Sequence, residues 1–315
     1  MSAPPLLPVL VGPTGSGKTE LALRAAALCS FPVEVIGLDS RQIYRQLEVG
    51  TAKPTAEERA RLPHHCVDFL DIDESYDAGR YRGRVERTLP QLWERGVVPL
   101  VVGGAGFYLR ALREGFLELP EGGARLVALR AAMDGESLEA LRERLALLDP
   151  SSAARIHPND RYRISRALEI QELSGRPLSE HEQEFAPSAV CGAAFAVVHL
   201  SPPRPFLHDR IERRARAWLR GPWQAELRAL LAAGHDATEP GLSVLGYPEV
   251  LASLRGELED AQLIERVVIA TRRYARQQET WFRKEECVER AADGAELVEP
   301  LVALLRAASE RRGPP

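Results

Sequence analysis

A glycine-rich segment close to the N-terminus contains residue types that can hold a phosphate group. Gly12, Gly17, Lys18 and Thr19 satisfy the pattern G-x-x-x-x-G-K-[ST], with a strand-like run before it and a helix-like run after it. In such a loop the backbone N–H groups face phosphate oxygens, the lysine bridges phosphates and the threonine hydroxyl can bind Mg²⁺. The pattern predicts a bound di- or triphosphate, with Thr19 as a metal ligand and these residues around the phosphates: Gly12, Pro13, Thr14, Gly15, Ser16, Gly17, Lys18 and Thr19.

A second candidate for chemistry is Asp39, which follows the short apolar run Val33 to Leu38. The carboxyl ends of parallel strands meet at one edge of a sheet, so we expect Asp39 beside the phosphate loop. Its carboxylate could accept a proton during a reaction, organise Mg²⁺, or only cap a local turn. Position alone leaves these roles open.

The elements that must hold these residues indicate an α/β fold. Four short apolar runs predict buried parallel strands at 6–11, 33–38, 97–102 and 193–200. Helical composition follows the phosphate loop, so strand, loop and helix form one unit. We expect a P-loop NTPase-like parallel sheet flanked by helices.

A helical insertion separates the last of these strands from the others. It lacks a convincing strand, and Ser137 and Asp160 are expected to cap two of its helices. After the last strand, long basic helices are expected at 205–219 and 260–284. The predicted domains are a catalytic core of residues 1–118 and 188–315 and an insertion domain of residues 119–187.

Composition narrows the setting of the protein. Its 45% hydrophobic and 27% charged residues are typical of a folded chain, and no apolar run approaches the roughly 20 residues of a transmembrane helix. The four cysteines form no C-x-x-C pair, which argues against a zinc site or a disulfide framework and favours a reducing cytoplasm. His64 and His65 lack ligand-spaced partners, so we expect them to be structural. Because the net charge is −4, any surface for nucleic acid must be a local patch.

Seven motif blocks follow one another along the chain. They are GPTGSGKT at 12–19, DSRQIY at 39–44, VGTAKP at 49–54, VVGGAGFYLRAL at 101–112, RIHPNDRYRISRALE at 155–169, LGYPE at 245–249 and TRRYARQQETWFRK at 271–284. Together they resemble the bacterial tRNA dimethylallyltransferases. Several blocks in the right order are more specific than any single loop.

The resemblance implies transfer of a dimethylallyl group from dimethylallyl diphosphate to N6 of adenine-37, just 3′ of the anticodon of tRNA, with release of diphosphate. The adenine would be extruded from the anticodon loop over Asp39, which accepts the proton of its amine. Lys18 and Mg²⁺ would stabilise the leaving diphosphate. The family also places an arginine near the diphosphate, and Arg210 or Arg214 is expected to supply it.

Contacts with the tRNA anticodon stem-loop are implied for three segments. Tyrosine interleaved with arginine suits base stacking and phosphate binding, although an isolated charged run would more often be a solvated helix face. The residues concerned are Asp39, Ser40, Arg41 and Gln42; Tyr162, Arg163, Ile164, Ser165 and Arg166; and Arg272, Arg273 and Arg276.

Two positions depart from the family's pattern. Ala105 stands where the family usually has a threonine whose hydroxyl lies near the reacting groups. Gln277 stands where a basic residue is usual. The arginines nearby in the late helix are expected to preserve the local charge.

Three other functions are compatible with parts of the sequence. The phosphate loop alone permits a small-molecule kinase that uses ATP. Prenyl transfer to free adenine nucleotides is a second alternative, which the arginine-rich insertion and late helix disfavour. An RNA-binding regulator with an inert loop is the third. For the main hypothesis we expect a cytoplasmic monomer that requires Mg²⁺ and does not associate with membranes.

Overall fold

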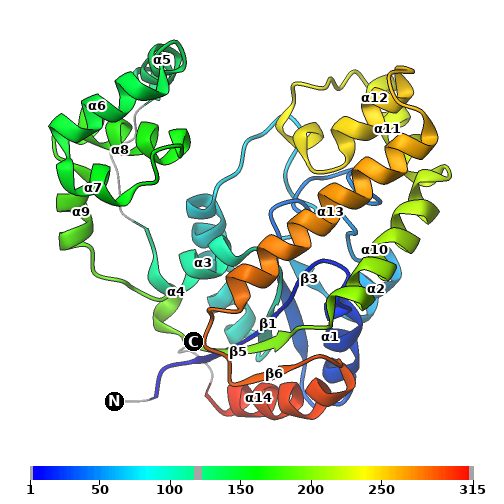
Figure 1. Ribbon diagram of the computed structural model, residues 1–315. Helices are drawn as coiled ribbons and strands as arrows, with labels where there is room; N and C mark the ends of the chain where they lie inside the picture. Colours follow the sequence, from blue (N-terminus) through cyan, green and yellow to red (C-terminus); the bar gives the residue numbers. More distant parts are fainter. Residues whose placement is uncertain (1–2, 117–122, 312–315) are drawn as a thin grey trace. The chain divides into compact units, whose positions relative to one another are not determined.

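Residues 3–116 and 123–311 are described in the computed structural model, where the chain divides into two compact units (Figure 1). The first comprises residues 1–115 and 188–315, and the second comprises residues 116–187. The first unit contains the sheet and the phosphate loop, whereas the elements described in the second are all helices.

The sheet of the first unit contains six parallel strands in the order β3-β2-β4-β1-β5-β6. All four strands expected from apolar runs are confirmed, and so is the α/β class. Sequence patterns do not predict β3 and β6, because they are only two and three residues long and carry histidine or charged side chains. The strands are β1 (Leu6–Val11), β2 (Val33–Leu38), β3 (His64–His65), β4 (Val98–Gly103), β5 (Ala194–Leu200) and β6 (Glu289–Ala291).

Strand register brings the functional segments to one edge of the sheet. Val11, the last residue of β1, pairs with Gly103 of β4 and His199 of β5. Leu38, the last residue of β2, also pairs with Gly103. The phosphate loop after β1, Asp39 after β2 and the glycine-rich turn after β4 therefore begin side by side.

Helices α1 (Lys18–Ala27) and α14 (Val298–Glu310) pack on one face of the sheet and share a buried apolar core with it. Side chains that alternate with this core along the strands, such as Ile36 and Val101, are fully buried as well, so both faces are covered. The remaining helices are α2 (Ala56–Arg61), α3 (Ala78–Glu94), α4 (Gly106–Glu114), α10 (Arg204–Leu219), α11 (Pro222–Ala232), α12 (Tyr247–Leu254) and α13 (Asp260–Phe282).

The second unit has a small core of its own, in which Leu141, Leu145 and Leu168 are buried. Both expected N-caps are confirmed, because the Ser137 side chain accepts from the Ala140 amide and Asp160 accepts from Arg163. Its helices are α5 (Gly123–Asp134), α6 (Leu138–Leu148), α7 (Pro150–Arg155), α8 (Arg161–Ser174) and α9 (Leu178–Glu184).

His64 and His65 form the edge strand β3, where His65 contacts the Glu34 carboxylate at 2.6 Å and His64 contacts the Leu62 carbonyl. No group of three or more His, Cys, Asp or Glu side chains in the described part of the chain could hold a metal ion. Among those same residues, no helix is long and apolar enough to cross a membrane.

His199 on β5 is a titratable side chain inside the protein. It is 2% exposed, and neither ring nitrogen has a hydrogen-bond partner within the described residues. Burial, together with the smaller effects of the positive charges of Arg290 and Lys18, lowers the pKa of His199 from 6.5 to about 4. The imidazole is therefore neutral at pH 7.

Replacing His199 by leucine is expected to make folding less sensitive to acid. Because the pKa of His199 is lower in the folded protein than in the unfolded chain, stability is full above pH 6.5 and falls as the pH drops toward about 4. At pH 5 this group removes roughly 2 kcal/mol of unfolding free energy. Urea unfolding at pH 7.5 and pH 5 should show a larger loss for the parent than for His199→Leu. Equal losses in both proteins would contradict the assignment.

Candidate functional site

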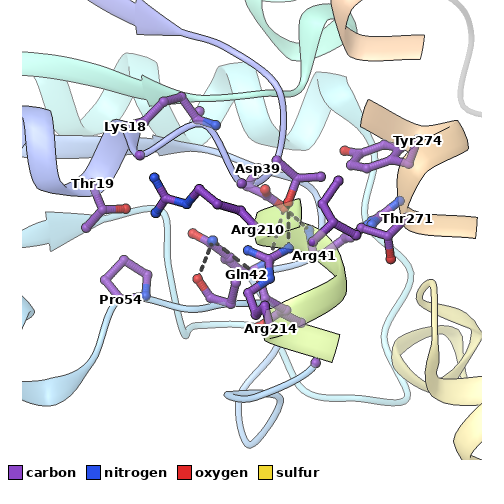
Figure 2. A pocket seen from close by; sticks show the side chains of 18 of the residues that line it. Lys18, Thr19, Asp39, Arg41, Gln42, Pro54, Arg210, Arg214, Thr271 and Tyr274 are labelled. Carbon is purple, nitrogen blue, oxygen red and sulfur yellow. Dashed lines mark hydrogen bonds between the residues drawn. The ribbon is translucent and has the colours of Figure 1, made fainter. Parts of the chain in front are cut away.

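A cavity of about 310 Å³ opens at the carboxyl edge of the sheet (Figure 2). It lies where the end of β4 and the segments that follow β1 and β2 meet helices α10 and α13. These sequence-predicted residues line it: Thr14, Gly15, Gly17, Lys18, Thr19, Asp39, Arg41, Gln42, Arg210 and Arg214.

The phosphate loop has a backbone that its glycines make possible. Gly15 and Gly17 have φ values of 81° and 102°, a region that side chains disfavour. A Cβ atom at Gly12 would overlap the backbone oxygen of Leu200. Predicted residues Gly12, Pro13 and Ser16 belong to the loop but do not line the cavity.

Lys18 is folded back over this loop. Its Nζ atom donates to the carbonyl oxygens of Gly12 and Pro13, both at 2.9 Å. Burial lowers the pKa of Lys18 to about 8; the charge of Asp39 opposes the shift and that of Arg214 adds to it. Its surroundings therefore make Lys18 easier to deprotonate than a lysine in water. An anion beside it would favour the charged ammonium form.

Two arginines of α10 face the same space. Arg214 Nη2 donates to the Thr14 hydroxyl at 3.0 Å. Burial lowers the pKa of Arg214 to about 10, and the charge of Arg210 adds to the effect. Three cationic groups therefore surround the loop at close quarters, an arrangement suited to a ligand with several negative charges.

Asp39 forms a local turn as well as lining the cavity. Its Oδ1 atom accepts from the backbone amides of Arg41 at 2.8 Å and Gln42 at 3.4 Å. Both bonds use Oδ1, so the capping role considered for this residue is present and involves one carboxylate oxygen.

Tyr274 on α13 is a site residue that sequence reasoning missed. The Arg41 guanidinium lies 3.6 Å from the centre of its ring. Burial raises the pKa of Tyr274 to about 12, and the negative charge of Asp39 adds to the shift. The phenol therefore stays protonated and can donate a hydrogen bond beside Asp39.

Gln278, also on α13, is a second missed residue. Its Oε1 atom accepts from the Thr14 amide at 2.8 Å, and its Nε2 atom donates to the Gly104 carbonyl at 2.9 Å. A Cβ atom at Gly104 would overlap the Gln278 amide, which explains the glycine there. Thr271, Tyr274 and Gln278 line the cavity at helical spacings of three and four residues, and that spacing was the available signal.

Two family models match this sequence. One described as IPP transferase covers residues 42–285, and one described as isopentenyl transferase covers residues 6–70. A tRNA dimethylallyltransferase of Anaeromyxobacter sp. (strain Fw109-5) is 44% identical, over 89% of this chain and 92% of that protein. The chain belongs to the tRNA dimethylallyltransferase family. The tRNA dimethylallyltransferase of Deinococcus radiodurans is 39% identical and covers 99% of both chains.

Solved structures agree with this membership. A tRNA isopentenylpyrophosphate transferase from Bacillus halodurans is 30% identical, with a TM-score of 0.67 over 97% of both chains. A eukaryotic dimethylallyltransferase described as acting on tRNA is 26% identical, with a TM-score of 0.78 over 94% of this chain and 76% of that one.

The residues that the family resemblance assigned to tRNA lie in different surroundings. In the insertion unit Tyr162 is 80% exposed, Arg163 pairs with Asp160 at 3.0 Å, and Arg166 pairs with Glu169. Ile164 is buried in the core of that unit, so its side chain is committed to packing rather than to RNA.

On α13 the three predicted arginines lie outside the cavity. Arg272 pairs with Glu212 at 2.9 Å. Arg273 and Arg276 line an open groove of about 600 Å³ together with Trp281 and Lys284. Of the 39–42 segment, Ser40 does not line the cavity.

Ala105, at the position of the family threonine, is the N-cap residue of α4 and does not line the cavity. Its φ and ψ of −87° and 86° resemble the −90° and 74° of Asp160, whose side chain caps α8. Alanine makes no side-chain cap here. A threonine hydroxyl at this position could therefore accept from a backbone amide of α4.

Ala105→Thr is expected to raise the unfolding free energy by about 1 kcal/mol through this cap. Ala105→Val is the matched control, because valine has the shape of threonine without the hydroxyl group. Denaturant unfolding of the two variants isolates the cap. If the threonine variant were no more stable than the valine variant, the cap would not form.

Diphosphate affinity is expected to weaken as the pH rises through about 8, where Lys18 loses its proton. Between pH 7 and pH 9 the dissociation constant of inorganic diphosphate should rise about tenfold. Calorimetric titration of the parent and of Lys18→Ala gives the test, since the variant shows only the titration of the ligand itself. Parallel pH profiles for the two proteins would exclude this role of Lys18.

Proposed function

We propose that this chain transfers a dimethylallyl group from dimethylallyl diphosphate to N6 of adenine-37 in tRNA, 3′ to the anticodon, and releases diphosphate. The observation that carries the proposal is one cavity lined by the phosphate loop, by Arg210 and Arg214, and by the carboxylate of Asp39. A cationic loop suits a diphosphate leaving group, and a carboxylate suits a reaction that must remove a proton.

In the proposed reaction a bond forms between adenine N6 and C1 of the donor, while the bond from C1 to the diphosphate oxygen breaks. The charge that develops on the leaving diphosphate is stabilised by Lys18, Arg210 and Arg214, together with the loop amides. Asp39 accepts the proton from the adenine amine, whose lone pair is delocalised into the ring and is otherwise a weak nucleophile. Its Oδ2 atom is the candidate acceptor, because Oδ1 already accepts two backbone amides.

Magnesium is the proposed cofactor, with the Thr19 hydroxyl as its protein ligand. Thr19 and Asp39 line one cavity, and Mg²⁺ commonly takes its other ligands from phosphates and water, so these residues fit such an ion. Bound there, Mg²⁺ would neutralise charge on the diphosphate.

The tRNA partner would be held by the 39–42 segment, by the exposed residues of α8 and by the arginines of α13. Tyr162 offers an exposed ring for stacking on a base, and Arg273 and Arg276 offer cations for phosphates. Extrusion of the adenine is part of the proposal, because N6 cannot reach Asp39 while the base is stacked. We also propose that the protein acts as a cytoplasmic monomer.

Transfer can be tested with purified protein, Mg²⁺ and donor labelled in the dimethylallyl group. The proposal predicts label on unmodified tRNA and none on ATP or AMP supplied separately. Label on AMP would favour an adenylate prenyltransferase. Consumption of ATP without prenyl transfer would favour a kinase.

Asp39→Asn is expected to slow single-turnover transfer by roughly 10²- to 10⁴-fold, the usual effect of losing a general base. The asparagine oxygen can still accept the Arg41 and Gln42 amides, so the turn should persist. Asp39→Ala removes the turn as well and serves as the control for that contribution. Donor affinity should change little in the asparagine variant.

An aspartate that mainly organised Mg²⁺ would give another pattern. Donor affinity would then fall together with the transfer rate in Asp39→Asn, and excess Mg²⁺ would restore both. That result would move Asp39 from the proton-transfer step to the metal site.

A further inference from the structure

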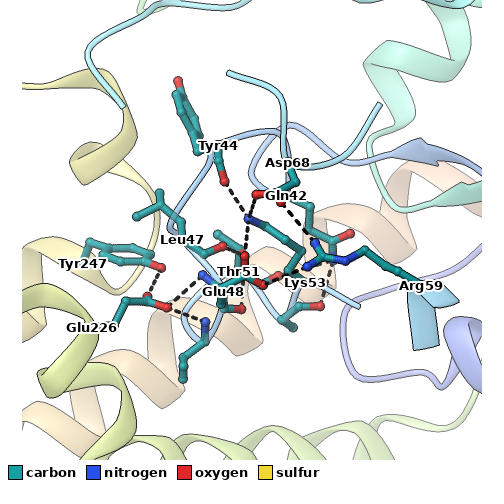
Figure 3. A network of polar contacts seen from close by, with 12 residues as sticks. Gln42, Tyr44, Leu47, Glu48, Thr51, Lys53, Arg59, Asp68, Glu226 and Tyr247 are labelled. Atoms are coloured by element: carbon teal, nitrogen blue, oxygen red, sulfur yellow. Dashed lines mark hydrogen bonds and ion pairs between the residues drawn. The ribbon is translucent and has the colours of Figure 1, made fainter. Parts of the chain in front are cut away.

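Lys53 is a fully buried cation beside the substrate cavity, in the segment between β2 and α2 (Figure 3). Its Nζ atom donates to the Tyr44 carbonyl at 2.8 Å, to Glu48 Oε1 at 3.0 Å and to Asp68 Oδ1 at 2.7 Å. A lysine ammonium group has three donors, and all three are used. Lys53 therefore joins its own segment, at Tyr44 and Glu48, to Asp68, which lies 15 positions further along the chain.

The segments joined in this way contain backbone conformations that side chains disfavour. Gln46, Ala52 and Asp68 have φ values of 66°, 53° and 60°, although none of them is glycine. Such residues persist only where surrounding contacts determine the conformation, and they occur often at functional sites. Lys53 follows Ala52 in the chain and contacts the Asp68 carboxylate, so it connects two of these positions.

A second anchor acts from α11 on the same loop. Glu226 Oε2 accepts from the backbone amides of Glu48 at 2.8 Å and Val49 at 2.7 Å. The other oxygen of Glu226 accepts from the Tyr247 hydroxyl. The loop is therefore held by Lys53, which belongs to the same segment, and by Glu226 of α11. Dashed lines in Figure 3 mark these contacts.

The loop places an amide in the cavity. Gln42 Nε2 donates to the carbonyls of Thr51 at 3.4 Å and Ala52 at 3.0 Å. Because carbonyl oxygens only accept hydrogen bonds, the Nε2 atom of Gln42 must face them. The Oε1 atom of Gln42 is then available to accept a hydrogen bond from a ligand. The Asp68 amide donates to the Gln42 backbone oxygen at 2.9 Å, so Gln42 is also connected to Asp68, which binds Lys53.

We propose that Lys53 is a positioning residue for the transfer reaction. It fixes the carbonyls of Thr51 and Ala52, and these hold Gln42 with its oxygen available to the exocyclic amine of the target base. An acceptor at this place favours adenine, whose N6 amine donates, over a base with a carbonyl at that position. The inference rests on the proposed function, because it assigns a role within that reaction.

The first test compares Lys53→Met with the parent. Methionine retains much of the side-chain volume but cannot hold the three oxygens. At saturating tRNA the single-turnover rate should fall about 10- to 100-fold, the effect of small misplacement of reacting groups, while donor affinity stays within about twofold. Arg59→Met is the matched control, because Arg59 lies 3.5 Å from Asp68 and 3.9 Å from Glu48 but does not contact the Tyr44 carbonyl. Its rate should remain within about twofold of the parent.

A double-mutant cycle separates positioning from general stability. If Lys53 acts through Gln42, Lys53→Met should slow transfer little further in a Gln42→Ala background. If the fold-losses in rate from the two substitutions multiplied in the double variant, the proposal would be overturned. A loss of donor affinity in Lys53→Met as large as its loss of rate would overturn it as well.

Asp68→Asn provides a second variant should Lys53→Met fail to fold. Asparagine tolerates the positive φ of this position, and the substitution removes one charged partner of Lys53. The same selective loss of transfer rate, smaller in size, is expected, and an unchanged rate would contradict the role of the cluster. Parent protein that transfers no label to tRNA would refute the proposed function itself, whereas an active parent with an unaffected Lys53→Met variant refutes only this inference.

Discussion

The Gln278 side-chain amide joins the phosphate loop to the turn after β4, at the edge of the sheet where the cavity opens. It bonds to Thr14 in the phosphate loop and to Gly104 after β4, although Thr14 and Gln278 are 264 positions apart. Because both ends of the amide are engaged, α13 cannot shift along the sheet without breaking a hydrogen bond in a buried place. Tyr274 and Thr271 lie on the same face of α13, so this contact also sets where they meet the cavity.

Electrostatics gives the cavity its chemical character. Lys18, Arg210 and Arg214 lie around one loop, and burial lowers the pKa of both Lys18 and Arg214. Crowded cations destabilise an isolated protein, but a diphosphate among them gains from each charge. Asp39 is the acidic group beside this cluster whose charge raises the pKa of Lys18. One cavity therefore holds both the cations and the carboxylate that the proposed transfer would use.

Local patterns in the sequence predict much of the fold and part of the site. The phosphate loop and the four central strands are coded by consecutive residues, so their positions follow from spacing and apolar runs. The α13 residues that complete the cavity depend on contacts between distant segments. The helical spacing of Thr271, Tyr274 and Gln278 indicates a shared face of the helix. The local sequence does not predict that this face contacts the phosphate loop. Strands β3 and β6 escape prediction because pairing with the sheet, rather than composition, defines them.

Single side chains show the same limit. Lys53 is one of many basic residues in the sequence, and only the structure places its ammonium group among the Tyr44, Glu48 and Asp68 oxygens. Ala105 occupies the position of a family threonine, and only the structure shows that this position is the N-cap of α4, where alanine makes no side-chain cap. Ile164 lies among residues expected to contact tRNA, but helical periodicity turns its side chain into the core of the insertion unit.

The central claim is that the cavity over Asp39 accepts one adenine of tRNA while the phosphate loop holds the leaving diphosphate. Its most direct test is to map the product nucleoside by nuclease digestion and mass spectrometry after reaction of unmodified tRNA with dimethylallyl diphosphate. The account predicts a single dimethylallyl group on N6 of the adenine just 3′ of the anticodon. Modification at other nucleotides, or at an atom other than N6, would contradict it.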